Sequence, residues 1–80
     1  MSAEHFRQIA ERIATAENSL IATLTECGKI SEGEATRVAA YYKKHRLVKL
    51  DLTNQRYNVV HGGLLERNII RVAVEKSIVD

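Results

Sequence analysis

Residues 28–34 of this chain read GKISEGE, and they predict the point at which one helix ends and another begins. Gly28 tolerates the positive φ angle that commonly follows the last turn of a helix. Ser31 and Glu34 have the S-x-x-E spacing of a capping box, in which each side chain bonds the otherwise free backbone amide of the other residue. Ile30, an apolar residue between polar neighbours, suits a very short strand. The segment therefore predicts a helix, a short strand and a second helix.

Residues 3–27, before this segment, predict one long amphipathic helix with Ser2 as its N-cap. Asn18 and Ser19 would suit a break into two helices, since both cap more readily than they propagate. The apolar stripe runs through them unbroken, however, at the spacings of three and four that one helical face requires. The stripe consists of Phe6, Ile9, Ile13, Ala16, Leu20, Leu24 and Cys27.

Residues 32–45 predict a second helix with an apolar inner face. That face consists of Ala35, Val38, Ala39 and Tyr42. Arg37, Tyr41 and Lys44, at positions i, i+4 and i+7, lie together on the opposite face. The two adjacent tyrosines are therefore expected to separate, with Tyr42 in the core and Tyr41 facing outward.

Residues 47–61 predict a β-hairpin, because residues 47–52 alternate between apolar and polar and residues 57–61 suit a second strand. A two-residue turn at Asn54 and Gln55 would place all the apolar cross-strand pairs on one face. These pairs would be Leu52 with Tyr57, Leu50 with Val59, and Val48 with His61. A longer loop is the alternative, since Asn-Gln is a weaker turn sequence than Asn-Gly.

The C-terminal segment, residues 64–77, follows a glycine pair and has two interpretations. A helix would place on one stripe Leu65, Ile69, Val72 and Lys76, whereas a strand would place on one face Ile70, Val72 and Val74. The length of the segment favours the helix. Its apolar surface exceeds what an 80-residue monomer readily covers, which is typical of a dimer interface. We therefore expect a homodimer formed through this C-terminal helix.

The composition indicates a single globular domain over residues 1–80, of the α+β class and mainly helical. The chain is 45% hydrophobic and 28% charged, which is unlike a disordered segment. Cys27 is the one cysteine, so an internal disulfide framework is excluded. No apolar run reaches the roughly 20 residues that span a bilayer, and the N-terminus lacks the pattern of a secretion signal. We therefore expect a cytoplasmic protein that does not enter a membrane.

Basic residues are concentrated in the middle of the chain, although the net charge is only +2. Residues 1–36 hold three basic and six acidic side chains, residues 37–61 hold six and one, and residues 62–80 hold three of each. We call the six cations of residues 37–61 the basic centre: Arg37, Lys43, Lys44, Arg46, Lys49 and Arg56. Such a cluster predicts a polyanionic partner. The alternative is a solvated helix end, because cations are favourable at helix C-termini.

The residue patterns predict neither an enzyme nor a metal or cofactor site. Residues 23–34 can be aligned with an EF-hand calcium loop, but Thr23, Thr25 and Cys27 occupy positions where calcium needs carboxylate or amide ligands. The three histidines have no metal-ligand spacing with one another or with the cysteine. We therefore expect a non-enzymatic protein without a cofactor.

Residues 28–31, followed by the helix over 32–45 and the hairpin over 47–61, resemble the strand–helix–wing part of winged-helix and helix-turn-helix-like proteins. The likeness extends to small proteins of phages and other mobile elements, and it covers roughly residues 20–61. It differs in that one helix, rather than two, stands between the short strand and the wing. The resemblance implies a single winged-helix-like domain, whose helix before the wing enters the major groove while the hairpin tip reaches the phosphates.

By that resemblance we expect a small protein that binds double-stranded DNA, a transcriptional regulator of phage or mobile-element origin. Arg37, Tyr41 and Lys44 would face the groove. Contacts to the DNA backbone would come from Lys43, Arg46, Lys49 and Arg56, and the wing tip would supply Asn54 and Gln55. The alternative is a non-enzymatic protein–protein interaction module, or a small phage-type inhibitor, that acts as a homodimer.

Overall fold

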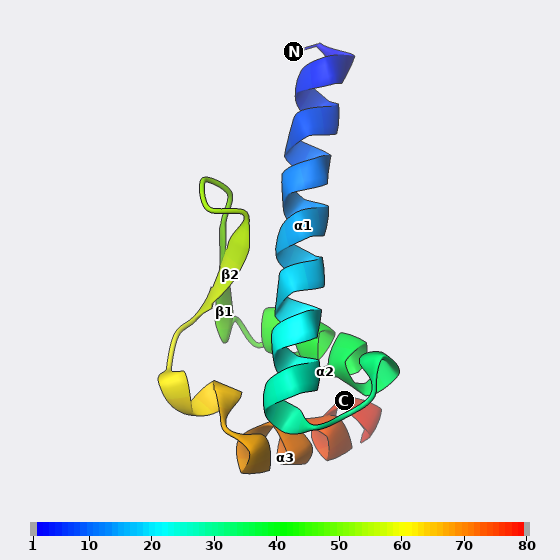
Figure 1. Ribbon diagram of the computed structural model, residues 1–80, viewed down its shortest axis with the longest axis vertical. Helices are drawn as coiled ribbons and strands as arrows, with labels where there is room; N and C mark the ends of the chain where they lie inside the picture. Colours follow the sequence, from blue (N-terminus) through cyan, green and yellow to red (C-terminus); the bar gives the residue numbers. More distant parts are fainter. Residues whose placement is uncertain (1, 80) are drawn as a thin grey trace.

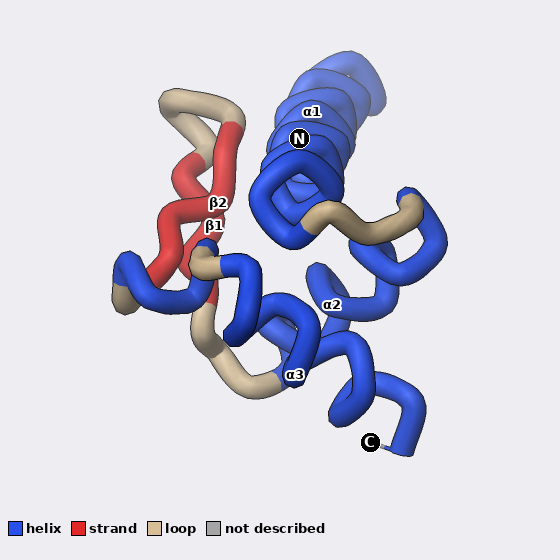
Figure 2. Tube along the Cα trace, turned by 60° about the horizontal axis from the view of Figure 1, so that its bottom comes forward, coloured by secondary structure: helices blue, strands red, loops and turns tan. Residues whose placement is uncertain are grey.

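The computed structural model describes residues 2–79, and it confirms the mainly helical α+β fold. The elements are α1 (Ala3–Gly28), α2 (Glu32–Lys44), β1 (Val48–Asp51), β2 (Arg56–Val59), the 3-10 turn η1 (Gly62–Leu65) and α3 (Arg67–Val79). α1 stands along the long axis of a 43 × 22 × 21 Å molecule, and α2 and α3 cross its C-terminal end (Figure 1). Figure 2 shows the hairpin on one side of α1, with α2 and α3 gathered beneath its C-terminal end.

The capping residues lie close to where the sequence predicts them. Ser31 and Glu34 form a complete capping box, with hydrogen bonds of 3.0 and 3.2 Å. The predicted strand at Ile30 is wrong, because that residue lies in the loop and its amide donates to the Thr25 carbonyl at the end of α1. The left-handed residue is Lys29, with φ 54°, rather than Gly28.

The hydrophobic core lies where α1, α2 and α3 meet. Its largest fully buried side chains are Tyr42, Leu24, Ile70 and Val38. The Tyr42 hydroxyl donates a 2.8 Å hydrogen bond to the Leu64 carbonyl, so the one polar atom of this side chain is satisfied. Because α2 and α3 reach only the C-terminal half of α1, the predicted apolar stripe is buried there and not above it: Phe6 is 60% exposed.

The hairpin forms as predicted, but its register differs by two residues. Val48 pairs with Val59 and Leu50 pairs with Tyr57, so Val48 does not pair with His61. The connection is the longer alternative, a four-residue loop over residues 52–55. A shift of two keeps every side chain on its predicted face, because side chains alternate with a period of two.

The C-terminal segment is a helix, which settles the ambiguity in its sequence. α3 begins at Arg67, and residues 62–65 form η1 instead of the first helical turn. The predicted inner stripe is wrong, because Ile69 and Val72 are 41% and 46% exposed while Ile70, Ala73 and Val74 are buried. No helix within residues 2–79 is long and apolar enough to cross a membrane.

Candidate nucleic-acid interface

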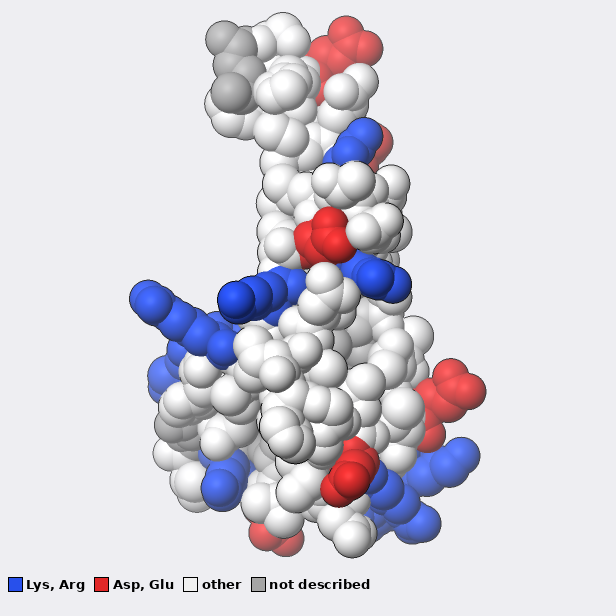
Figure 3. Space-filling view, turned by 90° about the vertical axis from the view of Figure 1, so that its left-hand side faces the viewer, with Lys and Arg blue, Asp and Glu red and all other residues white. Residues whose placement is uncertain are grey.

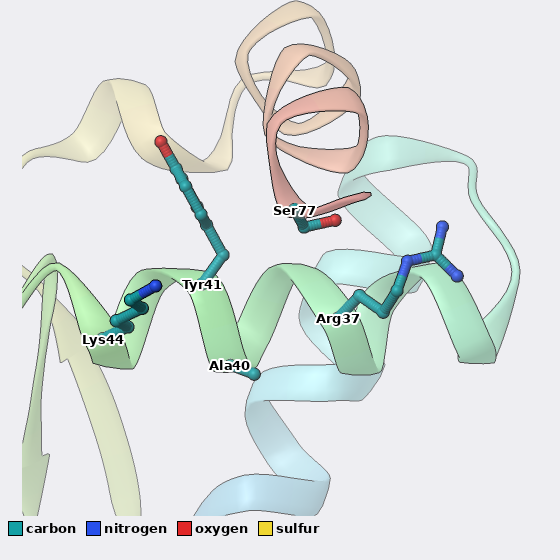
Figure 4. Close-up of a pocket in the computed structure, with 5 residues that line it drawn as sticks. All are labelled: Arg37, Ala40, Tyr41, Lys44 and Ser77. Atoms are coloured by element: carbon teal, nitrogen blue, oxygen red, sulfur yellow. The ribbon is translucent and has the colours of Figure 1, made fainter. Parts of the chain in front are cut away.

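Three of the predicted site residues meet in one cavity on the outer side of α2. Arg37, Tyr41 and Lys44 line a hollow of about 220 Å³, together with Ala40 and with Ser77 of α3. Figure 4 shows Ala40 on α2 between Arg37 and Lys44, with Ser77 facing them from α3. The small Ala40 side chain leaves open the space between the two cations. The predicted helical face is therefore present, and α3 forms one wall of it.

Tyr41 contributes a wall to this cavity rather than a free reading group. Its side chain is half-buried and packs against the edge of the core, which corrects the expectation that it faces fully outward. Its ring lies 4.5 Å from the His45 ring and 6.2 Å from the Tyr42 ring, measured between centroids. The ring is therefore held by aromatic neighbours on its own helix.

Lys43, the neighbour of Lys44, turns to the other side of α2. Its ammonium forms an ion pair with the Glu17 carboxylate of α1 and lies 5.9 Å from the centroid of the Tyr57 ring. Both members of the ion pair keep about a third of their side-chain surface exposed, at 34% and 41%. The charge of Lys43 is therefore partly neutralised within the molecule and directed away from the α2–α3 cavity.

The remaining cations of the basic centre lie on exposed positions after α2. Arg46, with φ 56°, forms the bend that leads from α2 into β1. Lys49 and Arg56 are exposed on the hairpin, where they pair across the strands with Asn58 and Asp51 respectively. Figure 3 shows Lys and Arg side chains projecting at mid-height on the hairpin side of the molecule.

The hairpin loop is ordered by its own side chains. The Asp51 carboxylate accepts hydrogen bonds from the Asn54 side chain at 2.8 Å and from its backbone amide at 3.2 Å. These bonds, the side-chain one above all, lower the pKa of Asp51 below its usual value. Gln55, with φ 52°, lies beside α1, where it lines a hollow with Gln8 and neighbouring residues. The tip is thus fixed against α1.

The N-terminal half of α2 is acidic, in contrast to its C-terminal half. Glu32 lines a hollow with Glu26 of α1. Glu34 accepts a hydrogen bond from the Ser31 amide, and this bond lowers the pKa of Glu34, so its carboxylate is charged at neutral pH. The charge boundary at residue 36 in the sequence was the signal for this contrast, whereas nothing in the sequence placed Ser77 beside Arg37.

Comparison with known proteins identifies no relative. No protein-family model, curated protein or solved structure matches this chain. Among residues 2–79, no group of three or more His, Cys, Asp or Glu side chains is placed to hold a metal ion.

Proposed function

We propose that this protein binds double-stranded DNA through the C-terminal half of α2 and the β-hairpin. The observation that carries the proposal is the α2–α3 cavity, where Arg37 and Lys44 flank one hollow on the outer side of α2. From there the chain continues through exposed Arg46 to exposed Lys49 on β1. Cations so arranged along adjoining elements attract phosphates and release condensed counterions on binding.

The salt dependence of binding follows from the number of cations that meet phosphates. Lys43 already has a carboxylate partner in Glu17, so five members of the basic centre remain for phosphate contacts. Five contacts give a slope of log K against log salt of about −4 to −5. The experiment is fluorescence anisotropy with a labelled random duplex over a range of salt concentrations. Binding that is absent at low salt, or unchanged between low and moderate salt, would overturn the proposal.

A charge-matched pair of variants separates the interface from general basicity. Lys49→Gln removes a cation from the hairpin, whereas Arg7→Gln removes an exposed cation from the N-terminal half of α1. We expect Lys49→Gln to weaken binding and to reduce the magnitude of the salt slope by about 1. Arg7→Gln should leave both nearly unchanged. An equal loss in the two variants would indicate attraction by net charge alone.

By the resemblance of residues 20–61 to winged-helix proteins, the biological role we propose is regulation of transcription in the cytoplasm. Small regulators of this kind occur in phages and other mobile elements. The measurement is whether the protein, when expressed, represses or activates a promoter that contains a duplex sequence selected by the purified protein. A promoter response that is the same with and without the selected sequence would contradict the role.

A second candidate function is homodimerisation through α3, with the protein acting as an interaction module or inhibitor. One observation favours it: α3 exposes Ile69, Val72, Ile78 and Val79, of which Ile78 is 68% and Val79 88% exposed. Apolar side chains gathered on one helix are typical of an interface. Sedimentation equilibrium of the wild type and of Val72→Glu measures this directly. A monomeric wild type at high concentration would contradict the dimer and leave the DNA-binding proposal in place.

A further inference from the structure

The charges along α2 restrict how that helix can approach DNA. A recognition helix in the major groove presents its N-terminal residues to the base edges, between two phosphate backbones. The N-terminal turn of α2 instead carries Glu32 and Glu34, and Glu26 of α1 lies beside Glu32. Carboxylates in that position would be repelled by the phosphates on both sides of the groove. The end of α2 that suits DNA is therefore its C-terminal half, from Arg37 onward.

The cavity on this half has the donors that a single phosphate needs. Arg37 offers a planar guanidinium fork and Lys44 a compact ammonium, the two groups that recognise phosphate oxygens most often. They lie on either side of Ala40, whose methyl group leaves the hollow open. The Ser77 hydroxyl donates to the Val74 carbonyl, so Ser77 closes the hollow rather than supplying a further donor.

The hairpin is the other part of the interface, and its shape differs from that of the cavity. Lys49 and Arg56 stand on an exposed strand face instead of beside a hollow. A two-stranded ribbon is narrow enough to enter the major groove, where side chains read base edges. The loop is held by Asp51 and Asn54, so these side chains are presented from a fixed frame.

From this contrast we infer that α2 lies across the DNA backbone, with the α2–α3 cavity holding one phosphate, and that the hairpin reads the bases. The inference rests on the proposed DNA binding and reverses the division of labour that the winged-helix resemblance implies. Arg37 and Lys44 then position the protein and carry no sequence information, whereas Lys49 and Arg56 determine sequence preference.

The test measures affinity and salt slope on two duplexes, one random and one selected from a random library by the wild-type protein. Arg37→Gln should weaken binding to both duplexes by the same factor and reduce the magnitude of the slope by about 1. Lys49→Gln should reduce the ratio of the two affinities. Arg7→Gln is the charge-matched control, and circular dichroism confirms that the variants are folded.

A methylphosphonate scan of the selected duplex locates the phosphate. Replacing the phosphate held in the cavity removes one backbone charge, so the penalty of Arg37→Gln should disappear at that position and persist at the others. A change of the affinity ratio in Arg37→Gln with an unchanged slope would overturn the inference, because α2 would then read bases. Equal affinity of the wild type for both duplexes would also overturn it, since the hairpin would read nothing. Failure of the proposed function differs from both outcomes, because the wild type would then bind neither duplex.

Discussion

The N-terminal and C-terminal halves of α1 carry the same apolar spacing and differ in what covers them. In the C-terminal half, Ala16 and Leu24 are fully buried and Leu20 is nearly so, because α2 and α3 cross this part of the helix. In the N-terminal half, Phe6 is 60% exposed and the hairpin is the nearest other element. The comparison teaches that a periodic stripe reports an apolar face and says nothing of its partner.

The difference also separates two sources of helix stability. The C-terminal half is held by burial of its stripe, which contributes in proportion to the area removed from water. The N-terminal half is held mainly as a continuation of a helix that already exists, since propagation is far less costly than nucleation. Its N-cap, Ser2, adds the hydrogen bond that it accepts from the His5 amide. Changes of equal size in the two halves should therefore have very different effects.

Leu24→Ala should have the largest effect, a loss of about 3 kcal/mol in the free energy of unfolding, from lost burial and the cavity left behind. Ile9→Ala removes a similar volume from the N-terminal half, where the side chain is only partly covered, and should cost less than about 1 kcal/mol. Urea denaturation followed by circular dichroism measures both. Equal losses would show that something covers the N-terminal half in solution.

Gly28→Ala tests how closely α3 approaches the last turn of α1. A Cβ at Gly28 would lie 2.5 Å from Ile70 Cγ2 and 3.2 Å from Ile70 Cβ, so α3 would have to shift. Overpacking of this kind costs about 1–3 kcal/mol. Gly33→Ala is the matched control, because its nearest neighbour, the Ser31 Oγ, is 4.0 Å away. That variant should be neutral or stabilising, and a stable Gly28→Ala protein would contradict the close packing.

Tyr42→Phe removes the hydrogen bond to the Leu64 carbonyl and should cost about 1 kcal/mol, since the carbonyl loses its partner. Burial raises the pKa of Tyr42 to about 12. The unfolded chain therefore ionises first as pH rises, and the stability that this group contributes is complete below about pH 10 and is lost between there and pH 12. Denaturation midpoints between pH 8 and 12 measure this loss. A wild type and a Tyr42→Phe variant with the same decline would contradict the role of Tyr42.

Much of the fold could be predicted from the sequence because the responsible interactions are local. The capping box needs only Ser31 and Glu34, three residues apart, and it forms as expected. The hairpin strands follow from alternation, but the register depends on the loop, where Asp51 collects the hydrogen bonds of Asn54 that favour a four-residue connection. At Ile30, the end of α1 competes for the amide and prevents a strand.

The candidate interface was less predictable because it depends on contacts distant in sequence. The i, i+4, i+7 spacing correctly placed Arg37 and Lys44 on one face of α2. Lys43 could not be removed from the predicted contacts without knowing that Glu17, 26 positions earlier in the chain, lies beside it. Ser77 likewise joins the cavity only because α3 packs against α2. The DNA contacts of the hairpin residues stay predictions.

Phe6→Ala should have the smallest effect and is the most direct test of the difference between the halves of α1. An exposed side chain with no buried contacts changes the free energy of unfolding by less than about 0.5 kcal/mol when truncated. Thermal melts at two protein concentrations, tenfold apart, measure both the effect and its origin. If a second copy covers Phe6, the melting temperature of the wild type rises with concentration and Phe6→Ala lowers it at the higher concentration. Coincident melts of both proteins would instead show that this half of α1 stands uncovered in solution.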